Sequence, residues 1–335
     1  MFTDCTLLND INITLPVNIA SSCYKGMFKN CTSLTTAPAL PSDNTESNCY
    51  SSMFEGCTSL TTAPILNSTS LSYGCYSSMF KNCASLTTAP LLNSESVTAL
   101  SSYCYASMFE GCTSLAAAPT LPQNITELQS SCFDSMFKGC TSLTTAPTLS
   151  ATTLADGCYS SMFDGCTSLT TAPALPATTL ADECYSGMFS DCTSLTTAPA
   201  LPATTISSSS YASMFCRCTS LTAMPTLNIT NINDCCCTWM FYGCTSLTSA
   251  TIPNIDINEY DYVAISEAFN EMFSGCINLD NVTCLIEDYT SDDEEQYDPF
   301  HNWLNGVAST GTISKYSSLV VPIPDGWTVT TLTNA

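Results

Sequence analysis

Basic side chains are scarce in this sequence of 335 residues. It contains 6 Lys and Arg residues against 29 Asp and Glu residues, which gives a formal net charge of -23. Binding to nucleic acid depends on clustered Lys or Arg side chains that neutralise phosphates. The composition therefore argues against a nucleic-acid partner.

Histidine and long apolar runs are also lacking. His301 is the only histidine, and it lies between Phe300 and Trp303. No other histidine could act as the base of a Ser-His-Asp or Cys-His catalytic arrangement. No spacing of carboxylates singles out a glycosidase pair. No apolar run reaches 18 residues, and the first residues show no secretory signal. We expect a non-enzymatic protein that uses no cofactor and does not insert into a membrane.

What the sequence does contain is a repeat. A Met-Phe dipeptide recurs at intervals of 26 to 32 residues. Self-similarity at such a period is the signature of stacked repeats, each of which contacts its neighbours. The repeat predicts a solenoid of eleven coils, which begin at Met1, Met27, Met53, Met79, Met108, Met136, Met162, Met188, Met214, Met240 and Met272.

Each coil combines two patterns. Cys23, Met27 and Cys31 have the i, i+4, i+8 spacing of a short helix with one apolar face. The β-branched residues that follow, with Leu34 pointing inward, predict a short strand that ends near Pro38. The expected fold class is therefore α/β, with one short strand and one short helix in each 26-residue coil.

Two features of the array concern its boundaries. The repeat stops past Cys276, so we expect residues 1–276 to form the solenoid and residues 277–335 to form a small C-terminal capping module. Insertions at 95–100 and 257–267 fall in return loops, where repeat proteins often place a binding face. The chain also begins inside a repeat, so the N-terminal coil is expected to dock on a partner or another subunit, unless the chain is a fragment.

The iterated motif Met-Phe-x-x-Cys-x-x-Leu resembles the BspA-like leucine-rich repeats of bacterial surface proteins. The resemblance implies a leucine-rich repeat solenoid and a function in attachment, because such proteins are typically adhesins. The segments 302–308 and 323–329 also resemble end modules that accompany these repeats in gut bacteria and their phages. An extracellular location follows from the resemblance, on a bacterial cell surface or a phage virion.

The 23 cysteines fall mainly into two rows, four residues before and four residues after each Met. The two cysteines of one coil are about 12 Å apart on a helix, which is too far for a disulfide. Small buried apolar residues are the favoured interpretation, and disulfides between coils or a metal site are the alternatives. Cys216, Cys235 and Cys237 lie outside both rows, on adjacent coils, and form a candidate disulfide cluster.

Carboxylates concentrate near the C-terminus, where 13 of the 29 acidic residues lie between Asp256 and Asp298. A solvated acidic surface is the simplest interpretation. The alternative is a calcium site, because this ion prefers oxygen ligands. Its candidate ligands are Asp292, Asp293, Glu294 and Asp298.

Hydroxyl side chains recur on the predicted strands. Stacked strands lie about 4.8 Å apart, so such ladders would form a regular face that binds a glycan or protein receptor on a host or neighbouring cell, or that orders water. The alternative function is a structural spacer or a virion or tail component that holds another module. The candidate binding-face residues are Ser33, Thr35, Ser59, Thr61, Ser85, Thr87, Tyr260 and Tyr262.

Overall fold

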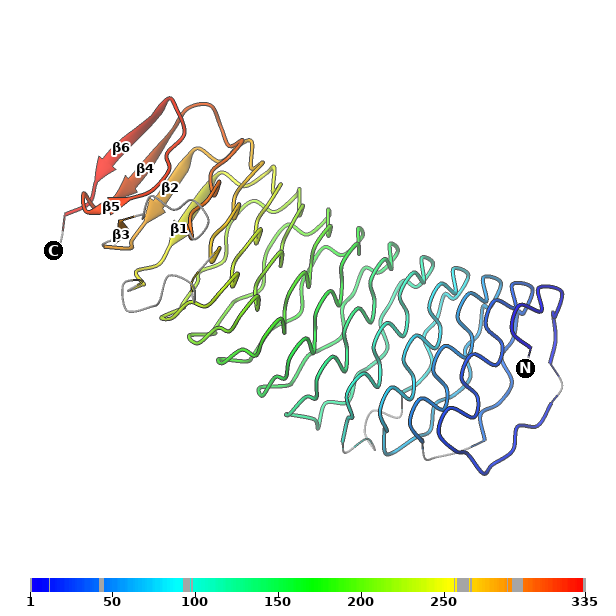
Figure 1. Cartoon of the computed structure of the whole chain (residues 1–335). Coiled ribbons are helices and arrows are strands. Elements are labelled where there is room, and N and C mark those ends of the chain that lie inside the picture. Colours follow the sequence, from blue (N-terminus) through cyan, green and yellow to red (C-terminus); the bar gives the residue numbers. More distant parts are fainter. Residues whose placement is uncertain are drawn as a thin grey trace.

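The protein is an elongated stack of coils, with the N-terminus at one end of the stack and the C-terminus at the other (Figure 1). This arrangement comes from a computed structural model. It describes residues 2–11, 13–41, 45–92, 97, 99–255, 257, 265, 267–287, 289–290 and 298–333. Each coil lies directly on the next, so residues one repeat apart become neighbours.

The segment predicted as a short helix is a run of consecutive turns, and the described residues contain no α-helix. Gly26 and Asn30 both have a φ of 60°, and left-handed residues recur every fourth position in the same segment of the other coils. An α-helix cannot continue through such residues. Four-residue turns give the same i, i+4, i+8 apolar spacing as a helix, which is why the pattern of Cys23, Met27 and Cys31 was misleading.

The hydrogen bonds of this segment alternate between the coil and its neighbour. Met27 donates its backbone N–H to the carbonyl of Tyr24, three residues earlier in the same run of turns, at 3.1 Å. The N–H groups of Tyr24 and Phe28 instead reach the carbonyls of Cys49 and Met53 on the next coil, both at 2.9 Å. The coils are therefore joined by backbone bonds, and each coil depends on its neighbours for satisfied polar groups.

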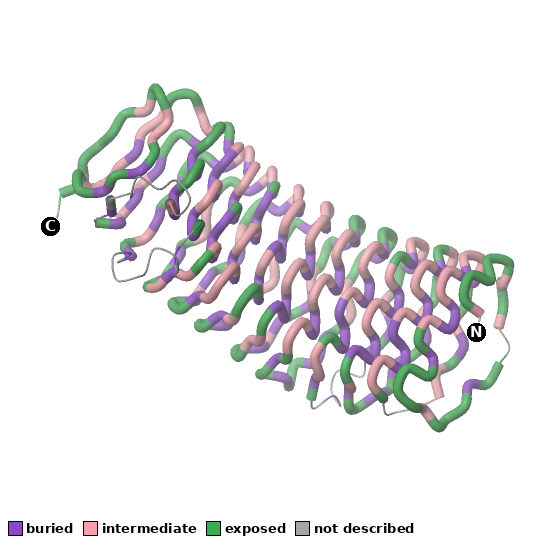
Figure 2. The backbone as a smooth tube through the Cα atoms, viewed as in Figure 1, coloured by how far each residue is buried: buried purple, intermediate pink, exposed green. Residues whose placement is uncertain are grey.

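Buried residues recur from coil to coil along the backbone (Figure 2). Among them are two stacks of aromatic side chains. Phenylalanines from Phe2 to Phe273 stack with ring centroids 5.5–5.8 Å apart. A second stack of Tyr rings and Phe133 runs from Tyr24 to Tyr211. Leu34, predicted to point inward, is buried, and the leucines seven residues after each Met are all 0% exposed from Leu34 to Leu279. Stacked rings add about 0.5–1.5 kcal/mol per pair beyond the area that they bury.

Regular strands form mainly in the last coils. β1 (Ser249–Ile252), β2 (Asn281–Cys284), β4 (Gly311–Lys315) and β6 (Trp327–Thr331) make a parallel sheet in the order β1-β2-β4-β6. In the coils from Met27 to Met214 a proline, such as Pro199, stands eleven residues after the Met, and only isolated bridges form. Thr251 and Thr283 take that place in β1 and β2. A proline cannot donate to the ladder, so its absence lets the strands extend.

The coil pattern continues past residue 276. Phe273 donates its N–H to the carbonyl of Trp303 at 2.9 Å, as Phe28 does to Met53. β4 extends the sheet, and β3 (Tyr289–Thr290) pairs in parallel with β5 (Leu319–Val320). Trp303 is fully buried and donates its indole N–H to the carbonyl of Pro322 at 2.8 Å. The hydrogen bonds between coils therefore continue across the predicted boundary at residue 276. A separate capping module over residues 277–335 stays a prediction.

Candidate functional site

Exposed threonines form a stripe along the stack. They occupy the eighth and ninth positions after Met27, Met53, Met79, Met136, Met162 and Met188. Parallel bridges join Thr36 to Thr62 and Thr62 to Thr88. We call this set the threonine stripe: Thr35, Thr36, Thr61, Thr62, Thr87, Thr88, Thr144, Thr145, Thr170, Thr171, Thr196 and Thr197, all of them exposed. The stripe carries no charged side chain and is interrupted at Ala116 and Ala117.

The hydroxyls of the stripe also contact the neighbouring coil. Thr61 donates both its N–H and its Oγ1 hydroxyl to the carbonyl of Thr35, at 3.2 and 3.3 Å. Each such hydroxyl keeps two acceptor lone pairs. Of the predicted binding-face residues, Thr35, Thr61 and Thr87 belong to this exposed stripe, whereas Ser33, Ser59 and Ser85 are only partly exposed. Tyr260 and Tyr262 lie outside the described residues.

Two exposed aliphatic side chains follow the stripe in adjacent coils. Ile65 is 62% exposed and Leu91 is 74% exposed. Leu66 donates its N–H to the carbonyl of Leu91 at 3.3 Å, which places these two segments side by side. The other coils from Met27 to Met214 have Ala or Thr at the position of Ile65. The repeat predicted hydroxyl side chains on this face but not the apolar pair of Ile65 and Leu91. The pair is visible in the sequence, because it interrupts the pattern of Ala and Thr at this position.

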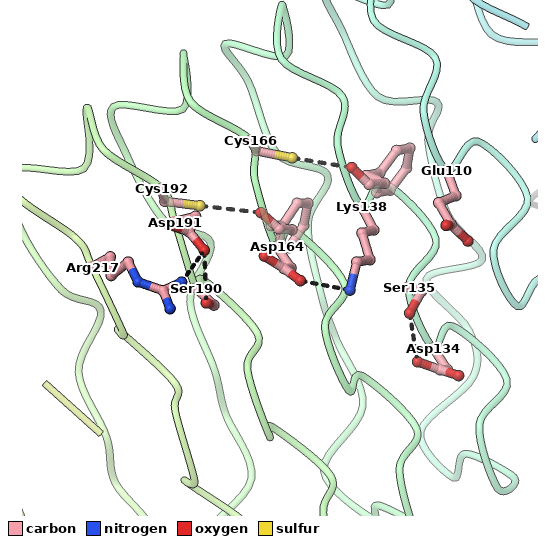
Figure 3. A network of polar contacts seen from close by, with 12 residues as sticks. Glu110, Asp134, Ser135, Lys138, Asp164, Cys166, Ser190, Asp191, Cys192 and Arg217 are labelled. Atoms are coloured by element: carbon pink, nitrogen blue, oxygen red, sulfur yellow. Dashed lines mark hydrogen bonds and ion pairs between the residues drawn. The ribbon is translucent and has the colours of Figure 1, made fainter. Parts of the chain in front are cut away.

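Most basic side chains form ion pairs between adjacent coils. Lys138 Nζ lies 2.7 Å from an Asp164 carboxylate oxygen, and Arg217 pairs with Asp191 at 2.9 Å (Figure 3). The hydrogen bond that Lys138 donates to the Asp164 carboxylate raises the pKa of Lys138. Two more pairs join Lys29 to Glu55 and Lys81 to Glu110. These partly exposed pairs contribute little to stability, about 0–1 kcal/mol each, but they neutralise cations in a row separate from the threonine stripe.

From Cys31 to Cys276, the cysteines four residues after a Met donate hydrogen bonds. Cys166 Sγ lies 3.1 Å from the carbonyl oxygen of Phe137, and Cys192 Sγ lies 3.1 Å from that of Phe163 (Figure 3). The same contact recurs at 3.0–3.1 Å from Cys31 to Cys276. Burial raises the pKa of these thiols, to about 12 at Cys57. These thiols are therefore uncharged, pack in the core and donate a hydrogen bond to a backbone carbonyl.

The candidate disulfide cluster consists of free thiols in this structure. Cys216 and Cys237 are buried, and Cys237 occupies the place of a ring at the end of the tyrosine stack. Cys235 is partly exposed, and burial together with the nearby carboxylate of Asp234 raises its pKa to about 12. A disulfide among Cys216, Cys235 and Cys237 stays a prediction.

The calcium hypothesis falls mostly outside the described residues, where Asp292, Asp293 and Glu294 lie. Asp298 is described, and its Oδ1 accepts the backbone N–H of Phe300 at 2.9 Å and the hydroxyl of Tyr289 at 3.5 Å. Within the described ranges, no three His, Cys, Asp or Glu side chains are grouped to hold a metal ion. The calcium site therefore stays a prediction.

A pocket of about 340 Å³ lies beside β1. It is bounded by residues 223–227 of one coil, by Ser249, Ala250, Thr251 and Pro253 of the next, and by Leu285. We call it the β1 groove. Its volume is at the lower end of the range of about 300–1,000 Å³ that is typical of ligand pockets. The sequence reasoning missed it, although the usual Thr-Ala-Pro changes there to Ala223-Met224-Pro225.

Comparison with known proteins identifies the class. A family model for the BspA-type leucine-rich repeat region matches in six copies, over residues 1–108, 105–222 and 134–268. A crystal structure of a leucine-rich repeat protein from Bacteroides ovatus ATCC 8483 shares 16% identity, covers 92% of this chain and 86% of its own, and gives a TM-score of 0.34. No curated protein matches.

The chain belongs to the BspA-type leucine-rich repeat family. Repeats of this family are typically non-catalytic, and leucine-rich repeat domains generally mediate protein–protein interaction. Proteins of the BspA type are typically surface-associated or secreted in bacteria. Among the residues that the structure describes, no helix is long and apolar enough to cross a membrane.

Proposed function

We propose that this protein is a non-enzymatic adhesion protein that binds a receptor on another cell through the threonine stripe. The observation that carries the proposal is the uncharged, exposed row of hydroxyls fixed at the spacing of the coils. A stripe whose backbone is held by bridges such as Thr62 to Thr88 loses little conformational entropy on binding.

Ile65 and Leu91 supply the apolar component of the proposed site. Binding energy in protein interfaces is concentrated in a few buried anchors surrounded by weaker polar contacts. These two exposed side chains lie on adjacent coils and follow the threonine stripe. A protein or glycan surface with an apolar patch beside hydroxyl or amide groups would match this arrangement.

The test is binding of the purified chain to arrays of glycans, mucins and bacterial surface proteins, followed by Ile65→Asp and Leu91→Asp variants. We expect saturable binding that weakens at least tenfold in both variants. Val329→Asp is the matched control, because Val329 is also an exposed aliphatic residue, 48% exposed, but lies on β6. Binding that is equally weak in the control would contradict the assignment of the site.

Absence of binding to every array would favour the alternative, a spacer or a virion or tail component without a ligand of its own. The continuous phenylalanine stack from Phe2 to Phe273 supports that alternative, because it makes the array a stiff rod. Location on a bacterial cell surface is part of the proposal and follows from the family.

A further inference from the structure

β1 is the edge strand of its sheet, although further coils lie beyond that edge in the stack. It pairs with β2 on one side and is the terminal strand of its sheet. On its other side lies the preceding coil, residues 223–227, and no bridge or backbone hydrogen bond between these two fully described segments is present. Pro225 contributes to this lack of pairing because it has no N–H to donate to β1. The outer edge of β1 thus has backbone groups that face the β1 groove.

The walls of the groove suit an extended chain. Met224, Pro225, Pro253 and Leu285 provide apolar contacts, while Ser249 and Thr251 project from β1 as exposed residues. An extended peptide that joins a sheet edge gains main-chain hydrogen bonds, and alternate side chains give it specificity. A site of this kind requires both a free strand edge and adjacent space, and β1 has both.

Charge defines the partner further. No Lys or Arg occurs between Tyr242 and Ser314. Exposed carboxylates lie near both ends of β1. Asp280 donates its N–H to the carbonyl of Thr248, just before β1, and Glu287 accepts a 3.1 Å hydrogen bond from Asn254, just after Pro253. A basic residue at each end of a short apolar segment would therefore be complementary.

We propose that the β1 groove binds an extended peptide segment of a partner protein, with alternating aliphatic residues flanked by Lys or Arg, which pairs with the outer edge of β1. The site lies in the coils that follow the last threonines of the stripe, Thr196 and Thr197, and is built from other residues. It gives the protein a second binding site, which recognises the main chain of a partner peptide and not a receptor surface.

The test uses a fluorescein-labelled, end-capped peptide Lys-Val-Thr-Val-Thr-Lys and fluorescence anisotropy. We expect saturable binding by the full chain. A peptide with Pro in place of the second Val should bind at least tenfold more weakly, because it lacks one N–H. A peptide with Glu in place of both Lys residues should also bind at least tenfold more weakly. Equal binding of the Pro peptide would overturn backbone pairing.

Variants of the protein locate the site. Ala223→Trp should fill the groove and weaken binding at least tenfold. Ala117→Trp is the matched control, because Ala117 is exposed at the same coil position but is bridged to Thr145. If Ala223→Trp fails to fold, Thr226→Trp fills the groove from another exposed position.

The outcomes separate the two proposals. The Ile65→Asp variant should bind the peptide as the parent chain does, whatever happens to receptor binding. No saturable binding of the Lys peptide, or equal binding by the parent chain and Ala223→Trp, would overturn the groove proposal and leave the threonine stripe untouched.

Discussion

Cys166 Sγ lies 3.1 Å from the carbonyl oxygen of Phe137 on the preceding coil. The same carbonyl accepts the backbone N–H of Cys140 at 3.0 Å. The thiol therefore satisfies the second lone pair of a buried carbonyl while it adds apolar volume to the core. This dual role gives the cysteine row a physical reason that disulfide chemistry does not supply.

Removal of one thiol should therefore destabilise the stack. Cys166→Ala loses a buried hydrogen bond and leaves a small cavity, and we expect a loss of about 1–2 kcal/mol of unfolding free energy. Thermal and urea unfolding in reductant would measure it. Cys5→Ala is the control, because Cys5 has the same coil position but is exposed. Equal effects of the two substitutions would contradict the role assigned to the row.

Ser210 should be improved by substitution. It lies in the row of Cys184 and Cys236, is 0% exposed, and its hydroxyl has no hydrogen-bond partner. A buried unsatisfied polar group costs about 1–3 kcal/mol. We expect Ser210→Cys to raise the unfolding free energy by about 1 kcal/mol, measured by urea unfolding.

The control for Ser210 is Ser68→Cys. Ser68 is also buried, but its hydroxyl lies 2.9 Å from the hydroxyl of Tyr76. Its loss should destabilise the protein, since the buried Tyr76 hydroxyl would lose its partner. If both substitutions shift stability in the same direction, the explanation from hydrogen-bond satisfaction is wrong.

The protein should lose stability in alkali. Burial raises the pKa of Cys57 and Cys140 from 9.0 to about 12, so the folded state keeps these thiols protonated. The unfolded chain releases its thiol protons above about pH 9. The stabilisation is complete below pH 9 and disappears as the pH rises toward 12. Melting temperatures at pH 7.5, 9 and 10.5 in reductant should fall over the last interval; a constant value from pH 9 to 10.5 would refute this.

Thiol labelling should distinguish exposed from buried cysteines. In the native protein at pH 8, Cys5 and Cys23 should react first because they are exposed. Cys235 should react slowly despite its partial exposure, because its pKa is raised to about 12. Mass spectrometry of the labelled peptides gives the order.

The same labelling tests the disulfide prediction. The denatured chain, unreduced, should label all 23 cysteines if every thiol is free. Loss of label from two of Cys216, Cys235 and Cys237, recovered after reduction, would establish a disulfide in that cluster.

Strand continuity at the C-terminal end should depend on Thr283. It lies in β2 opposite Thr251 of β1 and Ser314 of β4. Thr283→Pro removes an N–H from an internal strand, and we expect a loss of about 3 kcal/mol or more. Thr283→Ala keeps the N–H and should cost much less. Unfolding followed by tryptophan fluorescence reports on this end through Trp303 and Trp327; similar curves for both variants would show that the ladder bond is unimportant.

The repeat in the sequence is enough to predict the coil period, the family and the rows of residues that become buried. A strict spacing forces residues such as Leu34 and Leu60 into register when coils stack, so burial follows from arithmetic on the repeat. Hydroxyls spaced by the same period were likewise expected on one face, and Thr35 and Thr61 lie there.

The backbone conformation that follows this period depends on contacts between coils. A helix and a run of four-residue turns share the spacing of Cys23, Met27 and Cys31, and the choice depends on hydrogen bonds to the next coil, which no local pattern contains. The β1 groove has the same origin. It exists where the proline-bearing segment 223–227 meets the regular strand β1. These two segments do not pair, although the same two coils are joined elsewhere by backbone bonds such as that from the Phe215 N–H to the Met240 carbonyl.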